Sequence, residues 1–302
     1  MKYSEMFFSF QGEAEQTGVP ATWIRFMGCN LDCNGFGQKD PTDSTTYELP
    51  YLDFDVDSVS TVEELPVFKT GCDSSYSWSA RYKHLAHSAT ADEVVDRLDK
   101  LLQERYSAGG EHGWKNPNTQ QRAMMVFTGG EPMLNQKNMA STLNIIMDEY
   151  EEHCLPSYIV IETNATKLVK DLSFVEAILK IKSKGVKVIF STSPKLFNVS
   201  GERDALKVEV LVNYAQFAST LSCKFVVNNK KDCWDELDEF LSTIKLNPSL
   251  NNMIRYWAMP VGATKEDQST NEIADIADEA MKRGFMVSAR VHAYVYGNEI
   301  GR

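Results

Sequence analysis

The sequence predicts an α/β fold in which strands and helices alternate and the strands form a parallel sheet, either open or curled into a barrel. The first observation is that, from about residue 90, short apolar runs alternate with segments whose apolar residues recur at helical spacing. The second is that a polar loop, most often one carrying Gly, Ser, Thr or Asn, follows nearly every apolar run. Because ligands gather at the carboxyl ends of parallel strands, these loops predict one site across a whole face of the sheet.

Taken in order, the first predicted strand is "ATWIRF", residues 21–26, and the first helix is "TADEVVDRLDKLLQER", residues 90–105. Thr90 and Glu93 stand at the spacing of a capping box, which marks the start of this helix. Further strands are expected in residues 123–132, 158–166, 186–195, 223–229, 253–260 and 285–297, and further helices in residues 137–152, 173–185, 233–246 and 271–284.

Composition limits the kind of protein. The 302 residues are 43% hydrophobic and 24% charged, enough for a substantial core, and we expect residues 1–302 to form a single domain. The net charge of -11 and the absence of a Lys/Arg run argue against nucleic-acid binding. No segment resembles a signal peptide or reaches the roughly 18 apolar residues of a membrane span, so we expect a cytoplasmic protein without membrane contact.

Residues 34–71 break the alternating pattern. This segment contains eight acidic residues against two lysines and has no sustained period, so it is predicted to be an acidic surface insertion without regular structure. Its apolar residues, Tyr47, Tyr51, Leu52, Phe54 and Val67, are expected to order part of it.

Two cysteines, Cys29 and Cys33, lie four apart just before this insertion, and Cys72 lies just after it. The close pair suits either zinc or an iron–sulfur cluster. A closed zinc site lacks a nearby fourth ligand, whereas a three-thiolate 4Fe–4S cluster needs only these three residues. The remaining cysteines, Cys154, Cys223 and Cys233, are isolated and are expected to serve packing.

The loop "TGGEP", Thr128 to Pro132, follows a predicted strand and precedes a helix. Its paired glycines allow the backbone to approach a ligand closely, and the Glu131 carboxylate can accept hydrogen bonds from an ammonium group. Alone, such a motif is weak evidence for a site.

Together, the three cysteines, the TGGEP loop and the strand–helix alternation resemble the radical S-adenosylmethionine enzymes. The finer resemblance is to the 7-carboxy-7-deazaguanine synthases, which have counterparts of "EMFFSFQGEAEQTGVPATWIRFMGCNLDC", "IETNAT", "STSPK" and "KFVVN". This chain departs from them in three places: the third cysteine is displaced to Cys72, Ser74 replaces a Thr that coordinates magnesium, and Ala14 replaces the second Gly of a GEG motif.

The resemblance implies a partial (β/α)6-type TIM barrel of the radical S-adenosylmethionine kind, with residues 34–71 inserted in the cluster-binding loop. It also implies a lyase that converts 6-carboxy-5,6,7,8-tetrahydropterin to 7-carboxy-7-deazaguanine with loss of ammonia, in queuosine-type 7-deazapurine biosynthesis. The cofactors would be a 4Fe–4S cluster, S-adenosylmethionine and Mg²⁺. An electron donor such as flavodoxin and a homodimeric state are implied as well.

The resemblance also assigns roles to individual residues, which fall into three groups. The cluster would be held by Cys29, Cys33 and Cys72, and magnesium by Ser74. S-adenosylmethionine would contact Gly71, Asp73, Gly130, Glu131, Glu162, Ser193, Pro194, Lys195, Met259 and Pro260. The pterin would contact Phe10, Gln11, Gly12, Glu13, Arg25, Thr128 and His292.

Two alternatives stay open from the sequence. One is another radical enzyme, such as an activase that forms a glycyl radical on a partner protein. The other is a non-enzymatic binding protein in which the three cysteines hold zinc.

Overall fold

The computed structural model describes residues 1–250 and 252–302. Nine strands form one sheet in the order β3-β1-β2-β4-β5-β6-β7-β8-β9. From β2 to β9 every neighbouring pair is parallel, while β1 runs antiparallel to both β2 and β3. The strands are β1 (Lys2–Phe10), β2 (Pro20–Phe26), β3 (His87–Ser88), β4 (Met124–Gly129), β5 (Tyr158–Thr163), β6 (Lys187–Thr192), β7 (Thr220–Val227), β8 (Ile254–Pro260) and β9 (Met286–Val287).

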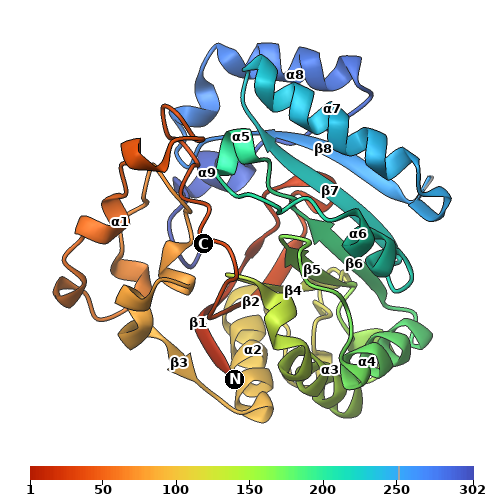
Figure 1. Ribbon diagram of the computed structural model, residues 1–302. Coiled ribbons are helices and arrows are strands. Elements are labelled where there is room, and N and C mark those ends of the chain that lie inside the picture. The colour runs from red at the N-terminus through yellow and green to blue at the C-terminus, as the bar shows by residue number, and fades with distance from the viewer. Residues whose placement is uncertain (251) are drawn as a thin grey trace.

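Helices cover the outer face of this curved sheet (Figure 1). They are α2 (Ala91–Tyr106), α3 (Gln136–Glu149), α4 (Leu172–Ser183), α5 (Phe197–Ser200), α6 (Val208–Ala215), α7 (Lys231–Lys245) and α8 (Glu272–Lys282), and α1 (Pro50–Asp53) and α9 (Val291–Tyr296) lie apart from that layer. The predicted capping box at α2 is present, since Thr90 and Glu93 exchange backbone-to-side-chain hydrogen bonds.

Side chains that alternate along the strands build two separate cores. On the outer face, residues such as Ile24, Phe127 and Phe190 pack with the helices in the main core. On the inner face, a small apolar cluster contains Phe7, Ala21, Trp23, Met124, Val126, Val160 and Ile189. Because the side-chain period of a strand is two, the residues that stand two positions beyond this inner cluster, toward the carboxyl ends, also face inward.

Residues 34–71 carry more local structure than the sequence predicted. The segment contains α1 and short 3₁₀ turns at Ser44–Thr46, Val56–Ser58 and Val62–Glu64. A third apolar cluster joins Tyr51, Val62, Leu65 and Phe68 of this segment to Tyr76, Tyr82 and Leu85 beyond Cys72. The insertion is therefore folded onto the chain that follows it.

Two further differences from the predicted elements matter for the site. Residues 2–10 form strand β1, which the sequence analysis did not identify. The strand predicted over residues 285–297 is wrong: only Met286–Val287 pair with β8, and Val291–Tyr296 form α9, which ends at Gly297 in the left-handed conformation.

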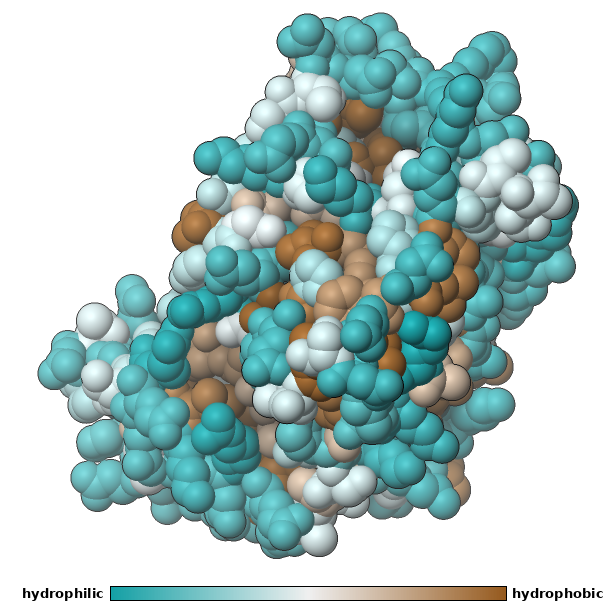
Figure 2. Space-filling view, turned by 90° about the vertical axis from the view of Figure 1, so that its left-hand side faces the viewer, coloured by the Kyte–Doolittle hydropathy of each residue, from teal (hydrophilic) through white to brown (hydrophobic). Residues whose placement is uncertain are grey.

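None of the helices in residues 1–250 and 252–302 has the length and apolar character needed to cross a membrane. The face that carries the insertion is mainly hydrophilic, with small hydrophobic areas set between polar ones (Figure 2).

Candidate functional site

A cavity of about 290 Å³ opens at the carboxyl ends of the strands. With two exceptions, every site residue predicted from the sequence lines it: Phe10, Gln11, Gly12, Glu13, Arg25, Cys29, Cys33, Gly71, Cys72, Asp73, Ser74, Thr128, Gly130, Glu162, Ser193, Lys195, Met259, Pro260 and His292. The two that do not line it are Glu131 and Pro194.

Strand register explains how distant residues meet in this cavity. Arg25 of β2 is paired with Thr128 of β4, and Glu162 of β5 is paired with Ser191 of β6. Each stands two positions beyond a residue of the inner apolar cluster, so the same alternation that buries Trp23 and Val160 turns Arg25 and Glu162 into the cavity.

The three predicted cluster ligands come from two loops that the fold brings together. Cys29 and Cys33 follow β2, and Cys72 follows the insertion. All three are free thiols that line the same cavity. Burial raises the pKa of Cys29 to about 11, and the pKa of Cys33 lies well above its usual value for the same reason. Ionisation of Cys72 would raise both pKa values further, while the charge of Lys195 lowers them.

Residues outside the sequence motif fix this loop. The backbone N–H groups of Asp32 and Cys33 both donate to Glu202 Oε1, and Gly35 N donates to Ser200 O at 2.9 Å. Cys33 itself has a left-handed backbone with φ of 52°. Ser200 at the end of α5 and Glu202 just beyond it therefore fix the turn at Cys33.

The cysteines suit an iron–sulfur cluster by their chemistry. Three thiols without a disulfide partner line one cavity, and thiolates are the ligands of such clusters. Within the described residues, no three or more His, Cys, Asp and Glu side chains are gathered as a compact metal-binding group. The fit thus rests on ligand type and the shared cavity wall.

The TGGEP loop packs directly against the first cysteine. A Cβ atom added at Gly130 would lie 2.3 Å from Gly28 O and 2.8 Å from Cys29 Cβ, so only glycine fits there. Glu131 is fully buried, and its carboxylate accepts from Thr163 Oγ1 at 2.7 Å, Asn164 N at 2.8 Å and Met133 N at 2.9 Å. Burial raises the pKa of Glu131. The hydrogen bonds of the Glu131 carboxylate thus connect the loop after β4 to the end of β5.

Glu13 lies between two cations that the sequence analysis did not select. Lys224 Nζ is 2.8 Å from Glu13 Oε2, and Arg290 Nε donates to Glu13 Oε1 at 3.1 Å. Burial favours the neutral acid, but the charges of Lys224 and Arg290 outweigh it and hold the pKa of Glu13 well below its usual range.

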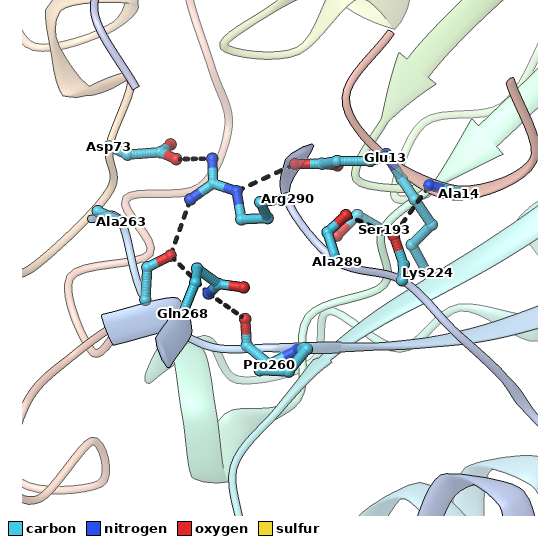
Figure 3. A network of polar contacts seen from close by, with 12 residues as sticks. Glu13, Ala14, Asp73, Ser193, Lys224, Pro260, Ala263, Gln268, Ala289 and Arg290 are labelled. Atoms are coloured by element: carbon cyan, nitrogen blue, oxygen red, sulfur yellow. Dashed lines mark hydrogen bonds and ion pairs between the residues drawn. The ribbon is translucent and has the colours of Figure 1, made fainter. Parts of the chain in front are cut away.

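Arg290 also joins two other loops to Glu13, as Figure 3 shows. Its Nη2 donates to Asp73 Oδ2 at 2.7 Å and its Nη1 donates to Gly262 O at 2.9 Å. Asp73 directly follows Cys72, so this guanidinium ties the third cysteine to the loop after β1 and the loop after β8.

Arg25, the predicted partner of a substrate carboxylate, already has a protein partner. Its Nε donates to Glu5 Oε1 at 2.6 Å, and Tyr76 Oη donates to the same oxygen at 2.8 Å. Burial opposes the charge of Arg25, but the neighbouring Tyr76 and Glu5 keep its pKa above the usual value. Within the described residues its two Nη groups make no hydrogen bond, so a bidentate face stays available for an anion.

Glu162 on β5, which is separated from the strand of Arg25 by β4 alone, accepts three hydrogen bonds or ion-pair contacts. Gln11 Nε2 donates to its Oε1 at 3.0 Å, Lys224 Nζ lies 3.5 Å from the same atom, and Thr128 Oγ1 donates to Oε2 at 3.2 Å. Nearby, Lys195 Nζ donates to Ser193 Oγ at 2.9 Å and lies 5.4 Å from the centre of the Phe36 ring.

His292 contacts the loop predicted to bind substrate. A Cβ atom at Gly12 would lie 1.9 Å from His292 Nδ1, so the imidazole rests on the glycine backbone. Burial lowers the pKa of His292 even though Glu13 opposes that change. The last residues of the described chain, Asn298–Arg302, also line the cavity.

The residues that sequence reasoning missed share one property: their role depends on long-range contacts. They are Glu5, Tyr76, Glu202, Lys224 and Arg290. The sequence alone could have placed Lys224 on the inner face. Its neighbours Cys223 and Phe225 are both apolar and belong to the helix-covered side, so the residue between them points the other way.

No family model matches this chain. It is 20% identical to the 7-carboxy-7-deazaguanine synthase of Leptospira interrogans over 301 residues, which cover 98% of this chain and 96% of that protein. It is 22% identical to that of Pyrobaculum aerophilum over 307 residues, 99% of this chain and 96% of the relative. A shorter match to that of Bacteroides thetaiotaomicron is 58% identical over 33 residues, 11% of this chain and 18% of the relative.

The crystal structure of QueE from Escherichia coli superposes with a TM-score of 0.50 at 17% identity, covering 96% of this chain and 94% of that chain. This likeness and the nine-stranded sheet of the described residues confirm the predicted α/β fold class, in which a curved, largely parallel sheet forms a partial barrel. The chain is thus similar to 7-carboxy-7-deazaguanine synthases along nearly its whole length.

Proposed function

We propose that the chain is a radical S-adenosylmethionine lyase that converts 6-carboxy-5,6,7,8-tetrahydropterin to 7-carboxy-7-deazaguanine with loss of ammonia. The observation that carries this proposal is the single cavity that gathers three free thiols, the glycine pair 129–130 and the residues Gln11, Glu13 and Arg25. The full-length similarity to 7-carboxy-7-deazaguanine synthases supports it.

In this proposal Cys29, Cys33 and Cys72 would hold a 4Fe–4S cluster, which when bound would supply the electron for the reductive cleavage of S-adenosylmethionine. An external donor such as flavodoxin would supply that electron to the protein. Ser74, whose hydroxyl lies 3.5 Å from Cys72 Sγ, offers an oxygen ligand for Mg²⁺.

The protein side chains bind and orient the two ligands. Glu162 would present a carboxylate to the ribose hydroxyls of S-adenosylmethionine, and Gly130 would contact its amino-acid part. Ser193 and Lys195 would offer a hydroxyl and a cation as further contacts. The free Nη groups of Arg25 would receive the pterin carboxylate, and Gln11 with Glu13 would receive the donor-rich pyrimidinone edge. The inner apolar cluster below excludes water from the reacting atoms.

The decisive test is anaerobic reconstitution with iron and sulfide, followed by an assay with the pterin, S-adenosylmethionine and a reductant. A brown protein that forms 7-carboxy-7-deazaguanine is expected. A brown protein that leaves the pterin unchanged would favour another radical enzyme, such as an activase. A colourless protein that carries zinc would favour the metal-stabilised binding protein.

A cysteine pair tests the proposed ligands. Cys72→Ala is expected to abolish both cluster absorption and turnover, because it removes one of three thiolates. Cys154→Ala is the matched control, since Cys154 is buried away from the cavity, and should retain both. Iron content that stays at the wild-type level in Cys72→Ala would contradict the assignment.

A further inference from the structure

We propose that Lys224 is a positioning residue that couples the binding of the two ligands, the nucleoside at Glu162 and the pterin at Gln11 and Glu13. The inference rests on the proposed function, from which it takes both ligands. The new element is a coupling free energy between the two subsites, which depends on Lys224 of β7.

The first observation is the burial of Lys224 between two carboxylates. Its side chain is 5% exposed, and Nζ lies 2.8 Å from Glu13 Oε2 and 3.5 Å from Glu162 Oε1. A buried ammonium is stable only where opposite charges and hydrogen bonds compensate its lost hydration. Lys224 therefore holds Glu13, on the loop after β1, beside Glu162, on β5.

The second observation is a direct link between the same two subsites through Gln11. Its Nε2 donates to Glu162 Oε1 at 3.0 Å, and its Oε1 accepts from Glu13 N at 3.1 Å. The amide proposed to bind the pterin is thus already hydrogen bonded to the carboxylate proposed to bind ribose.

Counting acceptor sites shows why the ligands must influence each other. A carboxylate oxygen accepts about two hydrogen bonds. Glu162 Oε1 already serves Gln11 and Lys224, and Oε2 serves Thr128. Of two ribose hydroxyls that donate to Glu162, one can take the remaining site on Oε2, and the other must compete with Gln11, Lys224 or Thr128. A Gln11 amide displaced in this way can turn to the pterin.

Lys224 determines which groups move in this exchange and which stay in place. Glu13 cannot follow the moving groups, because Arg290 donates to its other oxygen at 3.1 Å. Lys224 stays with Glu13 when the ribose arrives and keeps the neighbouring carboxylates from repelling one another. Each ligand then prepares the site for the other, so we expect positive coupling.

The experiment measures dissociation constants by calorimetry on the reconstituted holoenzyme without reductant, so that neither ligand reacts. S-adenosylmethionine is titrated with and without saturating 6-carboxy-5,6,7,8-tetrahydropterin, and the reverse titration follows. In the wild type, each ligand should lower the dissociation constant of the other by about fivefold or more. Thermodynamic linkage requires the two factors to be equal.

Lys224→Met should reduce this factor to about one, and Lys224→Arg, which keeps the cation, should restore part of it. Lys182→Met is the control, because Lys182 lies on α4 and donates to Phe217 O, away from the cavity; its factor should equal that of the wild type. If Lys224→Met fails to fold, Lys224→Gln, which removes the charge but keeps a hydrogen-bond donor for the two carboxylates, should also show a factor near one.

A wild-type factor of one, or an undiminished factor in the Lys224 variants, overturns the coupling. Turnover of the pterin by the wild type is measured separately. Turnover with uncoupled binding would leave the proposed function standing without this inference, whereas the absence of pterin binding and turnover would overturn both.

Discussion

At the scale of single residues, the site depends on carboxylates whose partners lie far away in the sequence. Glu13 meets Lys224 and Arg290 only because three loops converge at one end of the sheet. Glu131 differs from it, since its oxygens accept from a hydroxyl and two backbone N–H groups, and no cation among residues 1–250 and 252–302 contacts it. The two glutamates therefore have different roles: Glu13 lines the cavity, and Glu131 is buried behind its wall.

Glu131→Ala should destabilise the cluster-free protein by roughly 3 kcal/mol or more, because three buried donors lose their acceptor. Urea unfolding of the apoprotein measures the loss. Glu176→Ala on the exposed face of α4 is the control and should stay within about 0.5 kcal/mol of the wild type. A wild-type midpoint for Glu131→Ala would show that those donors find other partners.

Arg290→Met should cost about 3–5 kcal/mol, because it leaves Glu13 and Asp73 without the cation they share. Arg283 offers a close comparison, since it also binds two acids, Asp238 and Glu279, but at the surface of α8. Arg283→Met should therefore cost less than about 1 kcal/mol. Equal losses for the two variants, measured by denaturant unfolding, would contradict the role given to Arg290.

Sequence reasoning identified most residues of the cavity wall because motifs are local. Gln11, Glu13, Cys29 and Thr128 each stand beside other informative residues. Glu202 stands in a segment that looks ordinary, and Arg290 stands two residues before the predicted His292, but the function of both comes from contacts across more than 150 residues of chain. No local pattern encodes such contacts.

At the scale of elements, β4 to β8 were predictable because buried parallel strands are short apolar runs. The predicted strand at residues 285–297 failed because Val, Tyr and Phe favour strands on average, while tertiary contacts decide the outcome. Val291 N donates to Gly12 O at 2.8 Å, and Gly297 supplies a left-handed end to α9. The chain thus turns back over the cavity and does not extend the sheet.

The insertion element should respond to alkaline pH through Tyr82. Burial raises the pKa of Tyr82 to about 12, and its hydroxyl donates to Tyr51 O at 2.6 Å. A raised pKa means that the fold favours the neutral phenol, so this stability is complete below about pH 10 and is lost between about pH 10 and 12. By pH 11 the loss should reach about 1.4 kcal/mol.

Tyr82→Phe should lack this contribution while losing about 1 kcal/mol at neutral pH with the hydrogen bond. The free energies of unfolding of the two proteins, measured in urea at pH 8.5 and pH 11, should therefore approach each other at the higher pH. A difference that stays constant would mean that Tyr82 titrates as it does in the unfolded chain.

At the scale of the whole molecule, strands from both halves of the chain contribute to one cavity, so ligand binding should stabilise the complete fold. S-adenosylhomocysteine at a concentration 100 times its dissociation constant should add about 2.7 kcal/mol to the free energy of unfolding. Hydrogen exchange should show protection at the carboxyl-end loops, residues 28–33, 128–131 and 260–263. The opposite loops, such as 183–187, serve as the internal control.

The ends of the insertion meet, because Gly71 N donates to Phe36 O at 2.8 Å and so closes the loop between Cys33 and Cys72. The chain entropy of closing a loop grows only logarithmically, about 0.6 kcal/mol for each doubling of its length. Burial of one aromatic side chain such as Phe68 contributes about 1.5–3 kcal/mol. Residues 37–70 can therefore lengthen or shorten at little cost in stability, as long as Phe36 and Gly71 keep their contact and the segment keeps its small apolar cluster.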